Sequence, residues 1–549
     1  QRALGIEADR LTPSELIRAL LRAPVDLLWN GGIGTYVKAR AESNADVGDK
    51  AGDAVRVDAA ELRCRVVGEG GNLGFTQRGR IEYALGGGRL NTDAIDNAGG
   101  VNCSDHEVNI KVLLDAVVAD GDLTRKQRDR LLASMTDAVA DRVLRGSYLQ
   151  TQALSLALAQ GPAMLDVHDR MMRSLEQAGR LDRQLEALPD AEAVAERRAA
   201  GLGLTQPELA VLLAYSKITL YADLLESDLA QDPALAGELA GYFPDPLPKR
   251  FADRLERHRL RREIVATRVT NGIVDRAGTT FVFRLHEDTG AGPEEIARAF
   301  AVARDVFDMR GFWAEVEALD LEIGASTQIA MLLEARRLVE RATRWLLRGR
   351  PRPLDIGAEV ERFAAGAAAV AEALPDVLVS AEREEFEARV AALVDEGAPA
   401  ALARRVASLS DLFAALDILG VADACRRSIG EVTALHFLVG GRLHVHWLRD
   451  RIAALPRENR WQAMARAALR DDLFSLHAEL TGDVLSGGAE DEDSEARLNG
   501  WIERNRAAVE RCVGILGDIR TGGTHDLTTL AVALRELRNL IQAAAAVGA

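Results

Sequence analysis

The sequence predicts two fold classes in succession: α/β, with a partial parallel sheet, followed by all-α, with a large helical carboxy-terminal domain. Two observations predict this division. The first hundred or so residues alternate short apolar runs with glycine-rich turns, as buried strands and their tight connections do. From about His106 onward, apolar residues recur at helical spacing and few strand candidates remain. We therefore expect a chain that starts in an α/β region and ends in helices.

The α/β region opens with a helix and two strand candidates. Residues 14–22 predict a short helix, and residues 25–29 form a compact apolar run that suits a strand buried on both faces. Glycines within 31–34 end this strand. The more polar residues 35–54 indicate a helix-like segment, and residues 62–67 indicate a second buried parallel strand.

A glycine-rich loop, residues 68–74 (GEGGNLG), follows the second strand at once. Such loops bind nucleotides in α/β proteins, because glycine lets backbone amides approach a phosphate or ribose closely. The loop resembles a dinucleotide-binding GxGxxG fingerprint, but Leu73 stands where the third glycine is expected. A helical stretch at 76–83 and a short edge element at 86–92 come next. The alternative that these glycines only form tight turns stays open.

Two asparagines and one serine are the candidate ligand contacts. Asn72 and Asn97 each offer a donor and an acceptor without charge, which suits a nicotinamide carboxamide or a ribose hydroxyl. Residues 103–107 indicate the start of a helix, where Ser104 would occupy the cap and could face an anion. A plain cap without a ligand is the alternative for Ser104.

The helical region carries its own boundary signals. Residues 205–208 predict a capped helix start before the apolar run 209–224, and residues 326–347 predict a long amphipathic helix. Linkers are expected at four places, of which the last, where glycines meet an acidic run, is the clearest: 188–191, 244–248, 348–353 and 486–493.

Composition excludes several classes of function. A net charge of −16 and a pI near 5.2 leave no basic face for nucleic acid. The four cysteines are far apart and show neither metal-site nor disulfide spacing, which favours a reducing compartment. The apolar stretches are too short for a membrane span, so we expect a soluble, cytoplasmic protein without a membrane partner. The absence of an initiating methionine at Gln1 suggests a fragment.

Four histidines are candidates for metal ligands or acid–base groups. His444 and His446 alternate, which would place them on one strand face or apart on a helix. Without a cysteine or acidic cluster beside them, no metal site is predicted. His168 and His286 stand beside acidic residues, and we interpret both segments as solvated charged faces.

Two segments resemble one enzyme family. Residues 69–76 (EGGNLGFT) resemble the EGANGPTT segment of glutamate dehydrogenases, and residues 97–104 (NAGGVNCS) resemble their NAGGVTVS segment. Residues 26–36, 207–217 and 259–267 look like the very large bacterial NAD-dependent members, so the resemblance covers nearly the whole chain. It implies the carboxy-terminal part of a Rossmann-like NAD-binding domain at 1–115. A helical domain would follow at 116–549, with possible subdivisions near 188–205, 348–354 and 486–494.

The resemblance also implies roles for individual residues. Asn72 and Asn97 would lie against the nicotinamide ribose and carboxamide of NAD, and the backbone of Gly31 and Gly32 would approach the cofactor. Ser104 would contact the distal carboxylate of glutamate.

The sequence departs from the family in two respects. Thr35 stands where ordinary members have an asparagine, which puts that cofactor contact in doubt. The family's catalytic lysine and aspartate belong to sequence upstream of Gln1, so no catalytic residue is expected in this chain.

The resemblance implies oxidative deamination of L-glutamate to 2-oxoglutarate and ammonium with NAD as hydride acceptor, in a homo-oligomer. This chain alone is expected to be inactive. A non-catalytic helical assembly or regulatory module carrying an incomplete nucleotide fold is the alternative. A further alternative is dehydrogenation of a different amino acid, since dehydrogenases of that kind share the same loop, although Ser104 favours an acidic substrate.

Overall fold

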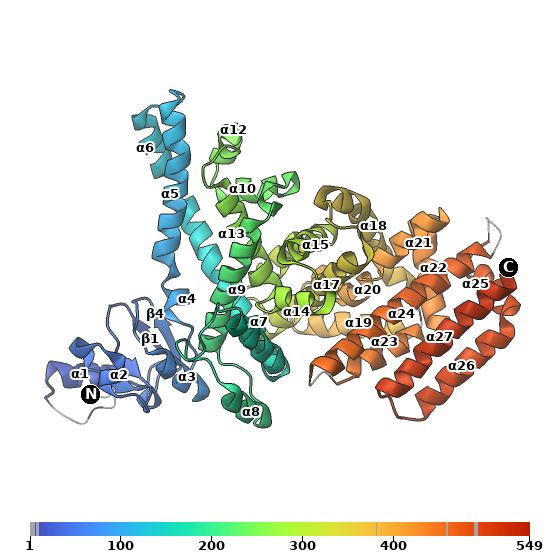
Figure 1. Ribbon diagram of the computed structural model, residues 1–549, viewed down its shortest axis with the longest axis horizontal. Helices are drawn as coiled ribbons and strands as arrows, with labels where there is room; N and C mark the ends of the chain where they lie inside the picture. The colour runs from blue at the N-terminus through green and yellow to red at the C-terminus, as the bar shows by residue number, and fades with distance from the viewer. Residues whose placement is uncertain (1–5, 7–9, 380, 457–458, 488–491, 549) are drawn as a thin grey trace. The chain divides into compact units, whose positions relative to one another are not determined.

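A computed structural model describes residue 6 and residues 10–379, 381–456, 459–487 and 492–548. The chain separates into two compact units, residues 1–284 and 285–549. Short parallel strands occur only near the start of the described chain, and helices make up most of the rest (Figure 1). The expected large helical part is thereby confirmed. The Rossmann-like assignment and the domain division at 115 stay predictions.

The first hundred residues of the first unit contain all of the described strands together with short helices. These elements are α1 (Pro13–Leu21), β1 (Leu27–Asn30), β2 (Val37–Lys38), α2 (Asn44–Val47), β3 (Val57–Asp58), β4 (Val66–Glu69), α3 (Gln77–Leu85) and α4 (Asp93–Asp96).

Helices make up the remainder of the first unit, and α14 crosses into the second. They are α5 (Ala98–Ala119), α6 (Arg125–Ser134), α7 (Thr136–Gln177), α8 (Ala191–Ala199), α9 (Gln206–Glu226), α10 (Ala236–Tyr242), α11 (Leu247–Arg250), α12 (Ala252–Leu255), α13 (Arg261–Ala277) and α14 (Phe281–Thr289).

The strands form two parallel pairs. β1 pairs with β4 in a register that sets Asn30 opposite Glu69, and β2 pairs with β3. An isolated parallel bridge between Val66 and Arg89 lies where the sequence predicts an edge element. A buried apolar core that includes Val67 and Phe75 packs beneath these strands. The core fixes the ends of β1 and β4, from which the glycine-rich loops leave.

Two predictions about this region were wrong. The strand at 25–29 is not buried on both faces: Leu27 is 55% and Trp29 is 61% exposed, and these alternate residues share one face of β1, which the described residues leave largely uncovered. Residues 35–54 do not form one helix. Ser43 caps the short α2, which ends at the left-handed Gly48, and Asp49 caps a further single turn. These local side-chain caps compete with a continuous helix.

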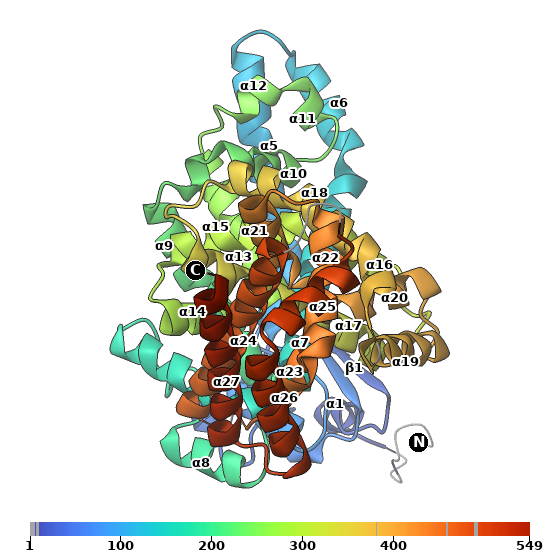
Figure 2. The same ribbon diagram turned by 90° about the vertical axis from the view of Figure 1, so that its right-hand side faces the viewer.

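The second unit is helical throughout its described residues, and α24, α26 and α27 lie side by side in it (Figure 2). Its helices are α15 (Pro293–Val306), α16 (Met309–Glu317), α17 (Ala325–Gly349), α18 (Ile356–Val377), α19 (Ala381–Asp395), α20 (Ala400–Leu412), α21 (Ala415–Cys425), α22 (Ile429–Arg442), α23 (Val445–Ala454), α24 (Arg460–Ser486), α25 (Ser494–Arg504), α26 (Arg506–Thr521) and α27 (Leu527–Gly548).

The predicted helix boundaries hold where capping chemistry was explicit. Thr205 and Glu208 form a capping box at the start of α9, with Pro207 in the first turn. The long helix expected at 326–347 is α17. The predicted linker at 486–493 includes residues 488–491, which lie outside the described residues.

Within the described residues, no single helix has the length and apolar character that crossing a membrane requires. One bent pair, α18 with α19, passes the same test by length and composition only.

A buried histidine cluster lies in the second unit. The rings of His436 and His477 stack at 3.6 Å, and His477 Nε2 lies 2.8 Å from the carbonyl oxygen of His436. His446 follows the start of α23, so the helical alternative for the pair at 444 and 446 holds, and its ring contacts Glu382. The described residues contain no group of three or more side chains able to hold a metal ion.

Acid should destabilise this cluster. Burial lowers the pKa of His477 to about 4, below the ordinary value of 6.5, so the unfolded chain binds a proton that the folded chain excludes. The stabilisation is complete above pH 6.5 and is lost as the pH falls towards 4, at about 1.4 kcal/mol per pH unit for this one histidine. Urea unfolding between pH 7.5 and 5 measures the slope, which His477→Gln should reduce by about one proton. A slope that His477→Gln leaves unchanged contradicts this assignment.

Candidate cofactor site

The candidate site is built on the carboxyl ends of β1 and β4. Because the two strands are parallel and in register, their ends meet at one edge, and residues 31–34 and 70–74 both leave there. Gly31, Gly32 and Asn72 are exposed, so their polar atoms are open to a ligand. This edge is where open α/β sheets bind nucleotides.

The two glycine-rich loops touch each other through their backbones. The amide of Gly71 donates to the carbonyl oxygen of Asn30 at 2.8 Å. A Cβ atom at Gly71 would stand 2.3 Å from the carbonyl oxygen of Gly32, which no side chain can tolerate. Glycine at position 71 is therefore a requirement of the approach between the loops.

A third segment, at the start of α5, joins the same edge. The side-chain amide of Asn97 donates to the side-chain oxygen of Asn72. Asp93 accepts from the amide of Leu73 at 2.8 Å, and Asp96 accepts from the amide of Glu69 at 3.0 Å. The structure thus brings together the segments around residues 70–72 and 97–100, as the sequence predicts.

A buried ion pair lies beneath the loops. The carboxylate of Glu69, which is fully buried, accepts two hydrogen bonds from Arg80, at 2.6 and 2.9 Å. It also accepts the amide of Phe75 at 3.2 Å, and Arg80 reaches Asp93 at 3.1 Å. Burial raises the pKa of Glu69, and Arg80 opposes that rise. The pair anchors both ends of the loop at 70–74 from below.

The amino-terminal end of α9 supports the same edge from the helical side of this unit. Gln206 donates to the side-chain oxygen of Asn91 at 2.6 Å, and Asn91 donates to Asp96 at 2.8 Å. Asp96 in turn holds the amide of Glu69. Sequence reasoning missed this relay and the Glu69–Arg80 pair. The only signal in the sequence was that charged residues, Glu69, Asp93 and Asp96, flank the loops.

Ser104 does not cap a helix, contrary to the prediction. The helix α5 starts at Ala98 with Asn97 as its cap, because the chain already turns helical at the 97–100 segment. Ser104 is an exposed residue inside this helix. It follows Asn97 by seven residues, so the two share a helix face about 10 Å apart.

Thr35 is buried rather than open to the loops. Its carbonyl oxygen accepts from Arg56 at 2.8 Å, and its amide donates to Asp49 at 3.0 Å. These bonds hold its backbone within the β2 region.

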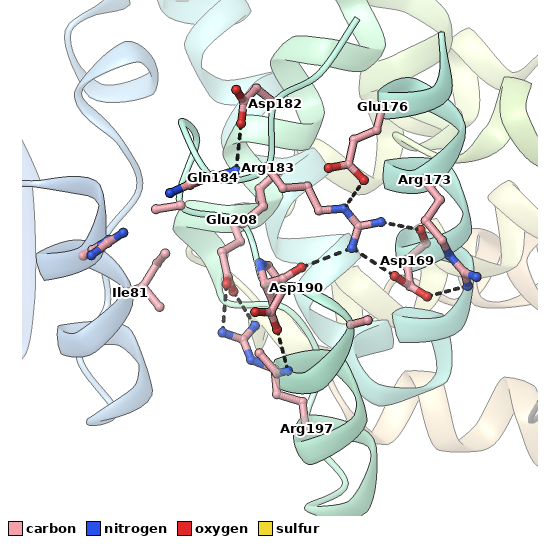
Figure 3. A pocket seen from close by; sticks show the side chains of 16 residues that line it. Ile81, Asp169, Arg173, Glu176, Asp182, Arg183, Gln184, Asp190, Arg197 and Glu208 are labelled. Carbon is pink, nitrogen blue, oxygen red and sulfur yellow. Dashed lines mark hydrogen bonds and ion pairs between the residues drawn. The ribbon is translucent and has the colours of Figure 1, made fainter. Parts of the chain in front are cut away.

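A larger hollow elsewhere in the first unit is a structural site. It measures about 920 Å³ and lies between α3, α7, α8, the start of α9 and the segment that joins α7 to α8 (Figure 3). Arg183 pairs with Asp169 at 3.1 Å, and Arg197 binds Glu208 through two bonds at 2.6 and 2.8 Å. These charges cancel one another, so they offer little to a ligand. The prediction of a solvated face at His168 was wrong, because this ion-pair network buries its neighbour Asp169.

These features define a class: a protein in which paired parallel strands carry glycine- and asparagine-rich loops at their carboxyl edge, joined to a long helical region. Residues 1–157 match the family model described as bacterial NAD-glutamate dehydrogenase, catalytic domain, and residues 201–539 match the model described as glutamate dehydrogenase, C-terminal. The chain belongs to the glutamate dehydrogenase family.

Curated relatives agree, and each is named NAD-specific glutamate dehydrogenase. The chain is 48% identical to the protein of Pseudomonas aeruginosa over 98% of its own length and 33% of the relative's. It is 45% identical to that of Halomonas elongata, over 99% and 34%, and 42% identical to that of Mycobacterium tuberculosis, over 97% and 33%. The chain thus spans about a third of the length of the curated relatives it matches.

Proposed function

We propose that this chain is the carboxy-terminal part of an NAD-dependent glutamate dehydrogenase and forms the wall of its cleft that holds the nicotinamide half of NAD. The convergence of the loop at 70–72 with the segment at 97–100 is the observation that carries the proposal. The name shared by the relatives supplies the cofactor and the substrate.

The hydrogen-bond donors and acceptors that the two asparagines leave unused fit a carboxamide. Their mutual hydrogen bond uses one amide hydrogen of Asn97 and the oxygen of Asn72. Among the described residues, the Oδ1 atom of Asn97 and the Nδ2 atom of Asn72 have no other side-chain or backbone partner. The oxygen of Asn97 therefore remains as an acceptor, and the remaining N–H groups of both asparagines remain as donors, for the amide group and oxygen of a nicotinamide carboxamide. Gly31 and Gly32 leave the adjacent surface open.

The protein's share of the reaction is positioning. NAD, when bound, accepts the hydride that leaves the α-carbon of L-glutamate. Water then hydrolyses the resulting iminium, so that its oxygen becomes the keto oxygen of 2-oxoglutarate and the nitrogen leaves as ammonium. Asn72 and Asn97 would fix the orientation of the nicotinamide ring towards the substrate. The lysine and aspartate that handle the protons would belong to sequence ahead of residue 1.

We assign Ser104 to the distal carboxylate of glutamate. It is exposed and shares a helix face with Asn97, so a substrate beside the nicotinamide could extend to it. We likewise propose a domain division near residue 115, a cytoplasmic location and a homo-oligomer. Activity with leucine or valine above that with glutamate would overturn the acidic substrate.

The test uses a protein of the relatives' full length that carries this chain. Asn97→Ala and Asn72→Ala should each raise the Kd for NAD by roughly tenfold, because each removes hydrogen bonds to a polar group. Ser104→Ala should raise KM for glutamate and leave the Kd for NAD unchanged. Equilibrium titration of NADH fluorescence and initial rates measure both. Full turnover by the 549-residue chain alone would contradict the upstream placement of the catalytic residues, and NAD affinity indifferent to both asparagines would favour a regulatory module.

A further inference from the structure

Side-chain hydrogen bonds join the first turn of α9 to both segments of the candidate cofactor site. Gln206, the first residue of the helix, donates to Oδ1 of Asn91 at 2.6 Å. Nδ2 of Asn91 donates to Oδ1 of Asp96 at 2.8 Å, and Oδ2 of Asp96 accepts from the amide of Glu69 at 3.0 Å. Glu69 and Asp96 directly precede the two segments that converge at the site. The relay therefore holds the residue ahead of each segment.

A second connection runs from the backbone of the same turn to the buried ion pair. The side-chain amide of Gln77 donates to the carbonyl oxygen of Pro207 at 3.2 Å, and the side-chain oxygen of Gln77 accepts from Arg80 at 3.2 Å. Arg80 in turn donates to the carboxylate of Glu69. The two connections thus reach Glu69 at two places, one at its amide and the other at its carboxylate.

The first turn of α9 is itself firmly held. Thr205 and Glu208 form its capping box. The carboxylate of Glu208, a residue that is 1% exposed, accepts two hydrogen bonds from Arg197 of α8 (Figure 3). A proline at the second helical position restricts the backbone further. Because the turn that carries Gln206 has little freedom to move, a side chain on it can position its partners.

The relay has one direction, which determines the chemistry needed at position 206. The carboxylate of Asp96 only accepts hydrogen bonds, so Asn91 turns its NH2 group towards Asp96 and its oxygen towards Gln206. That oxygen requires a donor. Gln206→Glu keeps the size of the side chain but sets a carboxylate against the oxygen of Asn91, in a chain that already contains the carboxylate of Asp96.

Gln206 lies in the part of the chain that matches the C-terminal family model, residues 201–539, whereas the segments that it reaches lie in the part that matches the catalytic-domain model, residues 1–157. We propose that Gln206 is a positioning residue for NAD, which acts through Asn91 and Asp96 to hold both cofactor segments in the arrangement that receives the nicotinamide half. The helical region thereby contributes to cofactor binding without touching the cofactor. This inference rests on the dehydrogenase function proposed above.

Amide hydrogen exchange of the 549-residue chain tests the relay without any cofactor. The amides of Glu69, Gly71 and Asn97 are hydrogen-bonded and report on the two segments. Gln206→Met removes the donor and should raise the opening equilibrium constant at these amides about threefold. Gln206→Glu, which also repels the oxygen of Asn91, should raise it about tenfold or more. Gln206→Lys restores a donor and should exchange as the unaltered chain does.

The order of these variants separates the relay from an effect on α9 itself. Position 206 is the first of the helix, where the helix dipole makes a negative charge stabilising and a positive charge destabilising. A role in helix stability alone therefore predicts that Gln206→Glu opens least and Gln206→Lys most, which is the reverse of the order expected from the relay. That reversed order, or exchange that Gln206→Glu leaves unchanged, overturns the inference.

Titration of the full-length protein with NADH separates failure of this inference from failure of the proposed function. Gln206→Glu should raise the Kd for NADH by about fivefold or more, and Gln206→Lys should leave it unchanged. Affinity that responds to Asn97→Ala but not to Gln206→Glu overturns the positioning role alone. Affinity that responds to neither overturns the proposed function, and the inference with it. Gln184→Glu, at an exposed glutamine between α7 and α8, makes the same charge change and should alter neither exchange nor affinity.

Discussion

Arg80→Met is expected to unfold the loop at 70–74 locally and to abolish NAD binding by the full-length protein. The substitution leaves the carboxylate of Glu69 buried without its partner. Removing one member of a buried ion pair costs about 3–5 kcal/mol, because the remaining charge is uncompensated. Amide hydrogen exchange of β4 measures the local free energy of opening, which should fall by this amount.

Two variants separate the lost pair from a general effect of arginine removal. Arg78→Met alters an exposed arginine of the same helix and should leave exchange in β4 unchanged. Adding Glu69→Gln to Arg80→Met removes the orphaned charge and should restore part of the loss. If the amides of β4 exchange at the same rate in Arg80→Met and in Arg78→Met, the ion pair does not anchor the loop.

Gly71→Ala should separate the two glycine-rich loops and raise the Kd for NAD by at least about tenfold. The added methyl group would stand 2.3 Å from the carbonyl oxygen of Gly32, and a backbone atom cannot move aside as a flexible side chain can. Fluorescence titration with NADH measures the effect. Gly146→Ala is the matched control. A Cβ atom at this position on α7 would have nothing within 4 Å, so the Kd for NAD should stay unchanged. Unaltered affinity in Gly71→Ala would show that the contact between loops is unimportant for the cofactor.

The sequence was sufficient for features that rest on local chemistry. The capping box at Thr205 and Glu208 is complete within four residues, so the start of α9 could be predicted. Apolar periodicity likewise predicted α17. The glycines and asparagines at 70–72 and 97 pointed to one crevice, because parallel strands end at a common edge.

Features that depend on distant partners could not be predicted. Whether a face of β1 is covered depends on which elements pack on it, and the apolar composition of the strand does not reveal that. The relay from Gln206 through Asn91 to Asp96 joins residues more than a hundred positions apart. The position of Ser104 inside α5 could not be predicted either. The glycines at 99 and 100 are typical of a loop, but in the structure they belong to the helix.

The central claim is that the segments 70–74 and 97–101 together hold the nicotinamide half of NAD. Hydrogen exchange of these two segments in the full-length protein, with NAD or with ADP, tests it most directly. ADP carries only the adenine side of the cofactor, so NAD should protect both segments and ADP neither. Saturating NAD that protects only one of the two segments, or ADP that protects them as well as NAD does, would contradict the claim.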